Sequence, residues 1–335
     1  MSILLGVFPA SFAKLEDDSI REASHRVLRS MHEDMVSLRG IVLTYSNWDD
    51  TYVLAEANDA QREDYALTNI PPAYMTVIKT NVALLYNSTG HNIMFKQVDF
   101  AKPSVYASDP LPPEWQALSS NHPFFTSKAS ALGGFTVFNG RLLMLTAAPV
   151  VRTDESGPEN GFFVMGRFYS IAEAYSIASR NSLCVGFYPL TSTDHSVVSR
   201  LSSMAKSTTI AAKTLVLPNI TDITWTDGSV FLVESVNPGT VTQRRNYDTS
   251  YYGNSSLTES RIIAYTTIGD FVTGAPSFIL ATDATRTVLT LGIASNVGTA
   301  AGLAVICVIA SIVIMVFVEC IVLRPTIGLS KTVKQ

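Results

Sequence analysis

The sequence is poor in charge and in cysteine. Asp, Glu, Lys and Arg make up 16% of its 335 residues, against about a quarter in ordinary soluble domains. The formal net charge of -4 is mild, and the chain has neither a basic stripe nor an acidic tail, which argues against a nucleic-acid partner. Its three cysteines, Cys184, Cys307 and Cys320, lack the spacing of a zinc site.

Motifs of the common enzyme classes are also missing. There is no HExxH metal pair, no GxSxG nucleophile turn, no GxxxxGK phosphate loop and no GxGxxG fingerprint. The five histidines are scattered, and a dispersed triad is recognised from geometry, not from sequence. We therefore predict no enzymatic activity, no catalytic residue, no metal site and no cofactor.

One stretch is apolar throughout. Val297–Val318 holds about 22 residues without a charge, which is enough for a helix to cross a bilayer core of about 30 Å. We predict one transmembrane helix at residues 294–323. The basic tail at 324–335 is predicted to be cytoplasmic, so the residues before about 290 are expected to lie outside the cytosol.

The N-terminus has two interpretations. Met1–Ala13 is apolar, but it is too short to span a bilayer and lacks the positive start of a signal peptide. Residues 1–13 are either a poor signal sequence or the remnant of a first transmembrane helix. The second interpretation would make the receptor two-pass.

From Lys14 to about Ala57 the pattern is that of one long amphipathic helix. Apolar residues recur at steps of three, four or seven and form a single stripe: Ile20, Val27, Met31, Leu38, Val42, Tyr45, Trp48 and Tyr52. The segment contains no proline and a single glycine, Gly40. A long helix is therefore expected, which either forms a coiled-coil stalk or lines the back of the domain that follows.

Short alternating runs after this helix predict an antiparallel sheet. Glu56–Asn69 is expected to be a loop. The predicted strands are Val77–Leu85, Ile93–Val98, Gly133–Phe138, Arg141–Val150 and Gly161–Phe168. The dipeptide Asn139-Gly140 between two of them predicts a hairpin turn. Together they predict a meander of about five strands behind the helix, in an α+β fold.

The sequence pattern of residues 181–290 predicts a second, smaller β-rich part with one short helix. The predicted strands are Leu183–Leu190, Thr214–Leu217, Ser229–Glu234, Arg261–Ile268 and Ser277–Ala281. His195–Ser207 is predicted to be the amphipathic helix. This part would lie next to the membrane.

Several motifs follow one another in an order that resembles a known family. The first set is Asn47-Trp48-Asp49-Asp50-Thr51-Tyr52, Pro110-Leu111-Pro112-Pro113, His122-Pro123 and Gly133-Gly134. The second is the hairpin Gly140-Arg141-Leu142 to Ala148-Pro149-Val150, then Asp154, Ser156-Gly157-Pro158 and Gly166-Arg167. Over about residues 20–180 this order resembles the CHASE4 domain, an extracytoplasmic sensory domain of membrane receptors. The resemblance implies a PAS/Cache-like sheet and a sensor domain at 14–180.

Five residues are candidates for ligand binding: Trp48, Asp49, Asp50, Tyr52 and Arg167. Adjacent aspartates on a helix point about 100° apart, so the two do not form a paired-carboxylate site. Arg167, at the end of an apolar strand, can clamp a carboxylate or phosphate with two N–H groups. The alternative is an ion pair of Arg167 with Asp49 or Asp50 that fixes the helix end on the sheet.

Three N-x-S/T sequons make Asn87, Asn219 and Asn254 candidate glycosylation sites. About three would arise by chance in a chain this rich in Asn, Ser and Thr. They are compatible with a secreted or surface location and do not establish it.

The leading hypothesis is the small-molecule-binding sensory region of a membrane receptor. It would signal through the transmembrane helix to a kinase or cyclase effector. Ala294, Gly298 and Gly302 form a small-residue face with a GxxxG pattern, which favours a homodimer. The alternative hypothesis is a single-span surface glycoprotein with a binding or adhesion role and no signalling.

Overall fold

The long first helix exists, but it ends earlier than predicted. The computed structural model describes residues 2–126, 131–190, 230–236 and 261–318. Its first helix, α1 (Ser2–Ser46), is 45 residues long. Trp48 then adopts an extended conformation, with φ -127° and ψ 131°, and a separate short helix α2 (Asp49–Leu54) follows. One extended residue therefore divides the predicted single helix into two.

The chain divides into two compact units. The larger unit comprises Ser19–Thr285, and the smaller unit comprises Met1–Asp18 together with Arg286–Gln335. The helix α1 contributes residues to both. All the sheets and cavities described below belong to the larger unit.

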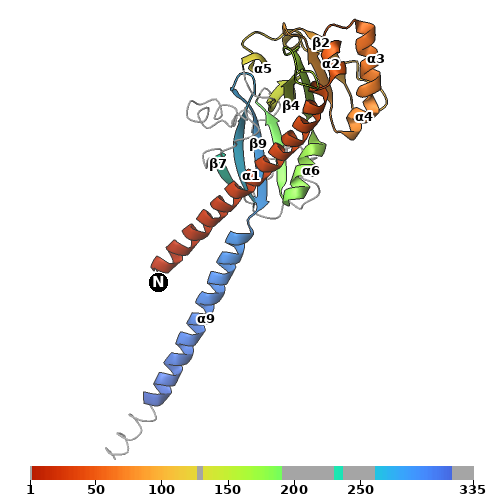
Figure 1. Ribbon diagram of the computed structural model, residues 1–335. Coiled ribbons are helices and arrows are strands. Elements are labelled where there is room, and N and C mark those ends of the chain that lie inside the picture. The colour runs from red at the N-terminus through yellow and green to blue at the C-terminus, as the bar shows by residue number, and fades with distance from the viewer. Residues whose placement is uncertain (1, 127–130, 191–229, 237–260, 319–335) are drawn as a thin grey trace, which may run out of the picture. The chain divides into compact units, whose positions relative to one another are not determined.

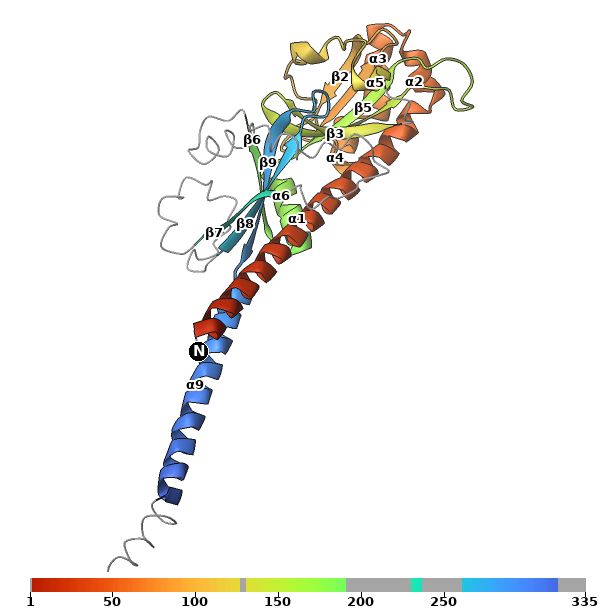
Figure 2. The same cartoon turned by 90° about the vertical axis from the view of Figure 1, so that its left-hand side faces the viewer.

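Within the larger unit, the predicted apolar stripe of α1 is buried. Val27, Met31, Leu38 and Val42 are fully buried in the main core. This core contains residues of two separate β-sheets, and both sheets lie along α1 (Figures 1 and 2). The amphipathic period of the sequence thus produced one helix face that two sheets share.

The first sheet has five antiparallel strands in the order β2-β1-β5-β4-β3. These are β1 (Val82–Tyr86), β2 (Asn92–Gln97), β3 (Leu132–Phe138), β4 (Arg141–Pro149) and β5 (Phe162–Phe168). The predicted meander is wrong in one respect: the last strand, β5, pairs with both β1 and β4. The fold is α+β, with a long N-terminal helix against an antiparallel sheet, as predicted.

The hairpin between β3 and β4 turns at the predicted dipeptide. Phe138 pairs with Arg141, and the two residues between them, Asn139 and Gly140, have φ values of 48° and 71°. Positive φ at both positions is the requirement of a two-residue hairpin turn, which Asn and Gly tolerate best. The local sequence alone was therefore sufficient to predict the position of this turn.

The loop predicted for Glu56–Asn69 is mostly helix. Helix α3 (Asp59–Asn69) begins with a capping box, in which Asn58 accepts from the backbone N–H of Gln61 and the Gln61 side chain accepts from that of Asn58. This reciprocal cap satisfies two N–H groups that would otherwise lack partners. Helix α4 (Pro72–Val77) starts at its proline, since proline favours the first helical position and does not break the helix there.

The two faces of the five-stranded sheet pack against different elements. One face meets α1 and residues of α2–α4 in the main core. The other face meets the 3₁₀ helix η1 (Pro113–Trp115) and the helix α5 (Pro123–Thr126) through an aromatic cluster. Both faces are therefore filled with side chains.

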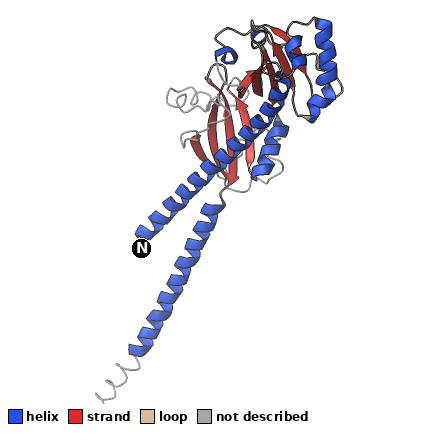
Figure 3. Ribbon diagram, in the orientation of Figure 1, coloured by secondary structure: helices blue, strands red, loops and turns tan. Residues whose placement is uncertain are grey.

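The second sheet has the order β6-β9-β8-β7 in the described part of the chain. Helix α6 (Ile171–Asn181) leads into it, and its strands are β6 (Cys184–Pro189), β7 (Val230–Val236), β8 (Arg261–Gly269) and β9 (Pro276–Thr285). Figure 3 shows the strands of both sheets together with their flanking helices. The predicted strand Thr214–Leu217 and the predicted helix His195–Ser207 lie outside the described residues.

In the smaller unit, α9 (Thr287–Phe317) is a helix of 31 residues within which most of the predicted 294–323 segment falls. Just before it, Arg286 donates from Nε to Glu16 of α1 at 2.9 Å, and both side chains are largely buried. Among the residues whose side chains the structure describes, no helix meets the length and hydropathy required of a membrane span.

Candidate functional site

Trp48, in the predicted motif that follows α1, contacts residues of both α1 and α3. The Trp48 ring meets the rings of Tyr45 and Tyr65 at centroid distances of 6.1 and 6.2 Å. Tyr65 donates to or accepts from Thr51 at 2.6 Å, and burial raises the pKa of its phenol to about 12. These contacts place Trp48 against the main core, where it joins α1 to α3.

Asp49 and Tyr52 hold the loop that precedes β5. The backbone N–H of Thr153 donates to Asp49 at 3.0 Å, and the Tyr52 hydroxyl donates to the Pro158 carbonyl at 3.1 Å. The guanidinium of Arg152 lies over the Tyr52 ring, 4.6 Å from its centroid. Asp50, like Asp49, is exposed. The motif therefore anchors a loop, and its predicted ligand role stays a prediction.

Arg167 is buried and binds backbone carbonyls. Its Nε donates to Lys79 at 2.5 Å and its Nη2 to Ile78 at 3.4 Å, with 8% of the residue exposed. These carbonyls follow the last turn of α4, where a cation compensates the negative end of the helix. The predicted ion pair with Asp49 or Asp50 is wrong: Arg167 caps α4 instead.

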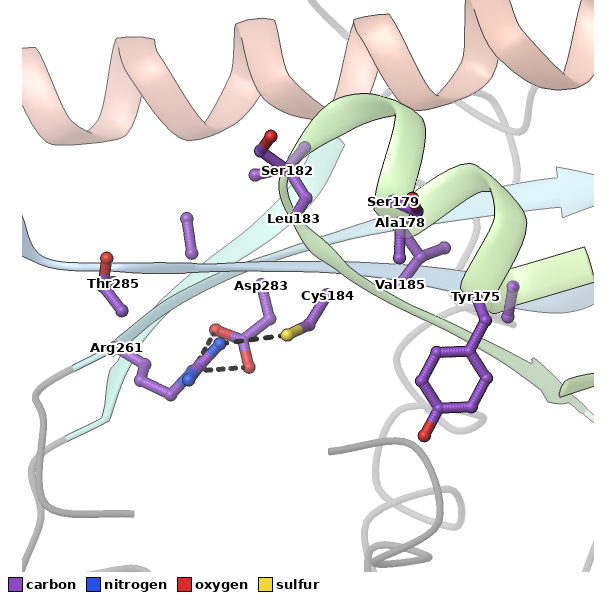
Figure 4. A pocket seen from close by; sticks show the side chains of 12 residues that line it. Tyr175, Ala178, Ser179, Ser182, Leu183, Cys184, Val185, Arg261, Asp283 and Thr285 are labelled. Carbon is purple, nitrogen blue, oxygen red and sulfur yellow. Dashed lines mark hydrogen bonds and ion pairs between the residues drawn. The ribbon is translucent and has the colours of Figure 1, made fainter. Parts of the chain in front are cut away.

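One cavity of about 490 Å³ lies beside α6 and the edge strand β6. Its polar centre is the pair Arg261–Asp283, in which the arginine Nε lies 2.8 and 2.9 Å from the two carboxylate oxygens. Arg261 also donates to the Cys184 sulfur at 3.2 Å. Figure 4 shows these three side chains turned toward one another. Their charges compensate each other, and burial raises the pKa of the Cys184 thiol, so it is a poor nucleophile.

A second cavity, of about 420 Å³, lies between the two sheets. We call it the hairpin cavity, because the turn between β8 and β9 forms one wall. The opposite wall comes from η1, the segment before α5, and β3. Its lining residues are Glu114, Trp115, Leu118, His122, Thr136, Val137, Leu190, Asp270, Val272, Thr273, Ala275, Pro276 and Ser277.

Asp270 ties the β8–β9 turn to the first sheet. One carboxylate oxygen accepts from the Thr136 hydroxyl at 2.7 Å. The other accepts from the backbone N–H groups of Val272 and Thr273, both at 2.9 Å. All these donors are neutral, so the negative charge of Asp270 has no cationic partner among the described residues.

His122 lines the same cavity as Asp270. Only 6% of this residue is exposed, and burial lowers its pKa to about 4, although the nearby Asp270 acts in the opposite direction. Its Nδ1 accepts from the backbone N–H of Phe124 at 3.3 Å. The imidazole is therefore neutral at pH 7, and its proton resides on Nε2.

Residues 30–188 match the family model of the CHASE4 domain. The matched segment covers slightly less than half of the chain and is similar to CHASE4 domains. This match supports an extracytoplasmic sensory role. No curated protein matches the sequence.

The solved structures similar to this chain include extracellular and ligand-binding domains of sensor proteins. The extracellular domain of the putative histidine kinase vpHK1S-Z8 is 10% identical, with 84% of this chain and 94% of that chain covered and a TM-score of 0.43. A sensory box/GGDEF family protein from Vibrio parahaemolyticus is 10% identical (84% and 99% covered, TM-score 0.44). The ligand-binding domain of the Campylobacter jejuni chemoreceptor Tlp3, solved with 4-methylisoleucine, is 9% identical (86% and 96%, 0.40).

The hairpin cavity joins the matched CHASE4 segment to the part that follows it. Trp115, His122 and Thr136 fall inside 30–188, whereas Asp270 lies beyond it. None of these four residues was predicted from the sequence to be a site residue. The only signal was the dipeptide His122-Pro123 among the family motifs, which by itself does not point to a cavity.

Among the three candidate glycosylation sites, only Asn87 lies in the described part of the chain. Its side-chain oxygen accepts from Thr89 and His91 in the turn before β2. Asn219 and Asn254 lie outside the described residues.

Proposed function

We propose that this chain is the sensory region of a membrane receptor and that a small molecule binds in its hairpin cavity. The observation that carries the proposal is His122: a nearly buried side chain lines this cavity with a donor that has no partner among the described residues. Sites for small molecules are typically apolar cavities with a few placed polar groups, and this donor is such a group. In the cavity beside α6, by contrast, the arginine and the carboxylate already satisfy each other.

We propose a route of transmission from the connectivity of the chain. The cavity contains Pro276 and Ser277, the first residues of β9, and this strand ends at Thr285, just before α9 begins at Thr287. A ligand that favours one position of the β8–β9 turn would shift the equilibrium between two arrangements of that strand. We propose that α9 carries this shift to a kinase or cyclase effector.

We further propose that α9 crosses the membrane. Its apolar side chains from Leu303 to Phe317 are all more than half exposed, with values from 53% to 69%. The exposure of so many large apolar groups is unfavourable in water and favourable in lipid. The uncharged stretch Val297–Val318 and the basic residues after it give the orientation, with the larger unit outside the cytosol.

A homodimer is the assembly we propose. A Cβ atom added at Gly298 or Gly302 would meet nothing within 4 Å, so this face is open to a neighbouring helix. Small residues at such positions allow two membrane helices to approach closely. Cross-linking of the full chain in membranes should give a dimer that Gly302→Leu weakens, whereas Val308→Leu, on an exposed position of the same helix, leaves it intact.

The ligand test is a thermal-shift screen of the full chain in detergent micelles against small metabolites. We expect at least one compound to raise the melting temperature. Val137→Phe, which fills the hairpin cavity, should abolish that shift, and Val53→Phe, at a position 65% exposed elsewhere, should keep it. If Val137→Phe retains the shift, the ligand binds elsewhere; if no compound stabilises the chain, small-molecule sensing is wrong.

The five predicted ligand residues can be judged in the same assay. Trp48, Asp49, Asp50, Tyr52 and Arg167 stay candidates by prediction only. If Arg167 clamps the ligand, Arg167→Lys should abolish the ligand-induced shift. If it only caps α4, the variant should lower the melting temperature and leave the shift unaltered.

A further inference from the structure

We infer that the hairpin cavity selects a small organic cation that also carries an uncharged hydrogen-bond acceptor, such as an amino alcohol. This inference rests on the proposed function, because it names the ligand class of the same cavity. Three features of the cavity carry it: the sign of its charges, the free donor of His122, and its apolar wall.

The charges that line the cavity have one sign. Among the described lining residues, Glu114 and Asp270 are the two that carry charge, both negative, and neither Lys nor Arg occurs there. Asp270 accepts hydrogen bonds only from neutral groups. Because neutral donors do not cancel its charge, the cavity attracts cations and disfavours anions.

His122 adds a requirement that the carboxylates do not explain. Its Nδ1 is occupied by the N–H of Phe124, so Nε2 is the donor, and Nε2 has no partner in the described part of the chain. The ring is fixed between Trp115 and Phe124, at centroid distances of 6.4 and 4.3 Å. This donor is open to solvent, so an acceptor on the ligand would replace water as its partner.

The acceptor on the ligand should be uncharged. A carboxylate would satisfy His122, but it would lie in the same cavity as Glu114 and Asp270, and like charges repel. A hydroxyl or carbonyl oxygen avoids this repulsion. The cavity therefore fits an amine bearing a hydroxyl or carbonyl group better than a zwitterionic amino acid.

The remaining wall suits the hydrocarbon part of such a molecule. Trp115, Leu118 and Leu190 line it and are all less than 10% exposed. An aromatic ring in the lining also attracts cations through its negative face. The volume of about 420 Å³ lies in the range of small-molecule sites, which is about 300–1,000 Å³.

The cavity beside α6 lacks this preference. Its described lining contains one cation and one anion, Arg261 and Asp283, paired through two short contacts. The net formal charge of these described residues is zero. The two cavities thus provide an internal contrast for the test.

The first experiment compares probes on the full chain in detergent micelles at low salt. Ethanolamine, choline, ethylamine, L-alanine and acetate are titrated by calorimetry. We expect ethanolamine and choline to bind, ethylamine to bind more weakly, and L-alanine and acetate not to bind. Glu114→Gln should weaken the binding of ethanolamine about two- to fivefold, which is the effect expected from the loss of one solvent-screened charge. The matched exposed substitution Glu56→Gln should have no effect.

The second experiment isolates the role of the histidine. Wild type should prefer ethanolamine over ethylamine about threefold or more, the value of one hydrogen bond to a neutral acceptor. His122→Phe keeps an aromatic ring at this position but lacks the donor, so the preference should disappear while ethylamine binding persists. A thermal melt of the variant verifies that it is folded, and His122→Gln, which restores an N–H donor, should recover part of the preference.

Each outcome decides the inference separately from the proposed function. If acetate or L-alanine binds and Val137→Phe abolishes that binding, the cavity is a sensor site but the cation inference is wrong. If ethanolamine binds equally well to wild type, Glu114→Gln and Val137→Phe, it binds elsewhere and the inference fails. If none of the five probes binds, the inference also fails, and the metabolite screen then judges the proposed function by itself.

Discussion

The five-stranded sheet buries aromatic and aliphatic side chains on both faces, whereas the second sheet buries many polar ones. In the first, Phe138, Phe163 and Leu145 are fully buried. In the second, Thr266, Thr267, Thr282 and Asp283 are buried, with exposures between 0 and 3%. The two sheets share the helix α1 and a common core, yet different interactions stabilise them.

The comparison distinguishes a sheet stabilised mainly by apolar packing from a sheet in which buried polar groups also contribute. Apolar packing depends on the area removed from water and has no preferred direction. Buried polar groups are stable only with their specific partners, and the loss of one partner leaves a large penalty. In the second sheet, the pair of Arg261 and Asp283 is such a contact, and Asp283 belongs to β9, the strand that precedes α9.

The largest expected effect comes from a side chain of the first sheet that also contacts the second sheet. Phe135 of β3 contacts Tyr169 and Phe278 edge to face at centroid distances of 5.4 and 5.6 Å. Phe135→Ala should lower the free energy of unfolding by about 3–5 kcal/mol, because it opens a cavity where the sheets meet. Denaturant unfolding measures this, with the exposed Val53→Ala as control. A loss below about 1 kcal/mol would mean that the sheets do not depend on each other.

In the ion pair of the second sheet, a single substitution should destabilise the protein more than the double substitution does. Asp283→Leu should cost about 3 kcal/mol, because it leaves the charge of Arg261 largely buried without its carboxylate. The double variant Arg261→Met with Asp283→Leu should recover most of this loss. Equal costs for the single and double variants, measured by thermal unfolding, would contradict the view that polar pairing governs this sheet.

Acidification should weaken the junction between the sheets through His122. Its pKa is about 4 in the folded protein against 6.5 when unperturbed, so the folded state binds fewer protons in this range. Its contribution is complete above pH 6.5 and is lost as the pH falls toward 4; between pH 7 and pH 5 the loss is about 2 kcal/mol. Chemical denaturation at several pH values should show this slope in wild type, and a similar slope in His122→Phe would assign it to other groups.

The smallest effects should be those of the two helix caps, one for each sheet. Asn58 caps α3, which packs on the first sheet, and Ser170 caps α6, which leads into the second; both form capping boxes. Replacement by alanine should cost about 1 kcal/mol in each case, and Asn58→Gly only a few tenths. Thermal melts check this. Unequal losses would show that one of the two helices depends more on its cap than on packing.

The elements best predicted from the sequence were those set by local or periodic signals. The apolar stripe of α1 follows from residue spacing, and the hairpin at Asn139-Gly140 from two residues that tolerate positive φ. The helix α3 was missed because its capping box, Asn58 with Gln61, was not recognised within a polar segment. The order of the first sheet was missed because pairing of β5 with β1 joins segments that are far apart in the chain.

The candidate site was the least predictable part. The Trp48 motif was correctly recognised as part of a family, but its contacts fix a loop and a helix end. Arg167 was considered as a clamp or as a partner of Asp49 or Asp50, and it bonds the carbonyls after α4 instead. A side chain's partner depends on where distant backbone segments come to lie, and residue type alone does not specify this.

The sequence by itself determined the α+β class, the long helix, the CHASE4 relationship and the uncharged segment at Val297–Val318. Each follows from composition, period or motif order, which are properties of neighbouring residues. Only the tertiary structure brought His122 of the first part and Asp270 of the second into the lining of one cavity. Their meeting depends on how two complete sheets pack along one helix, and no local stretch of sequence contains that information.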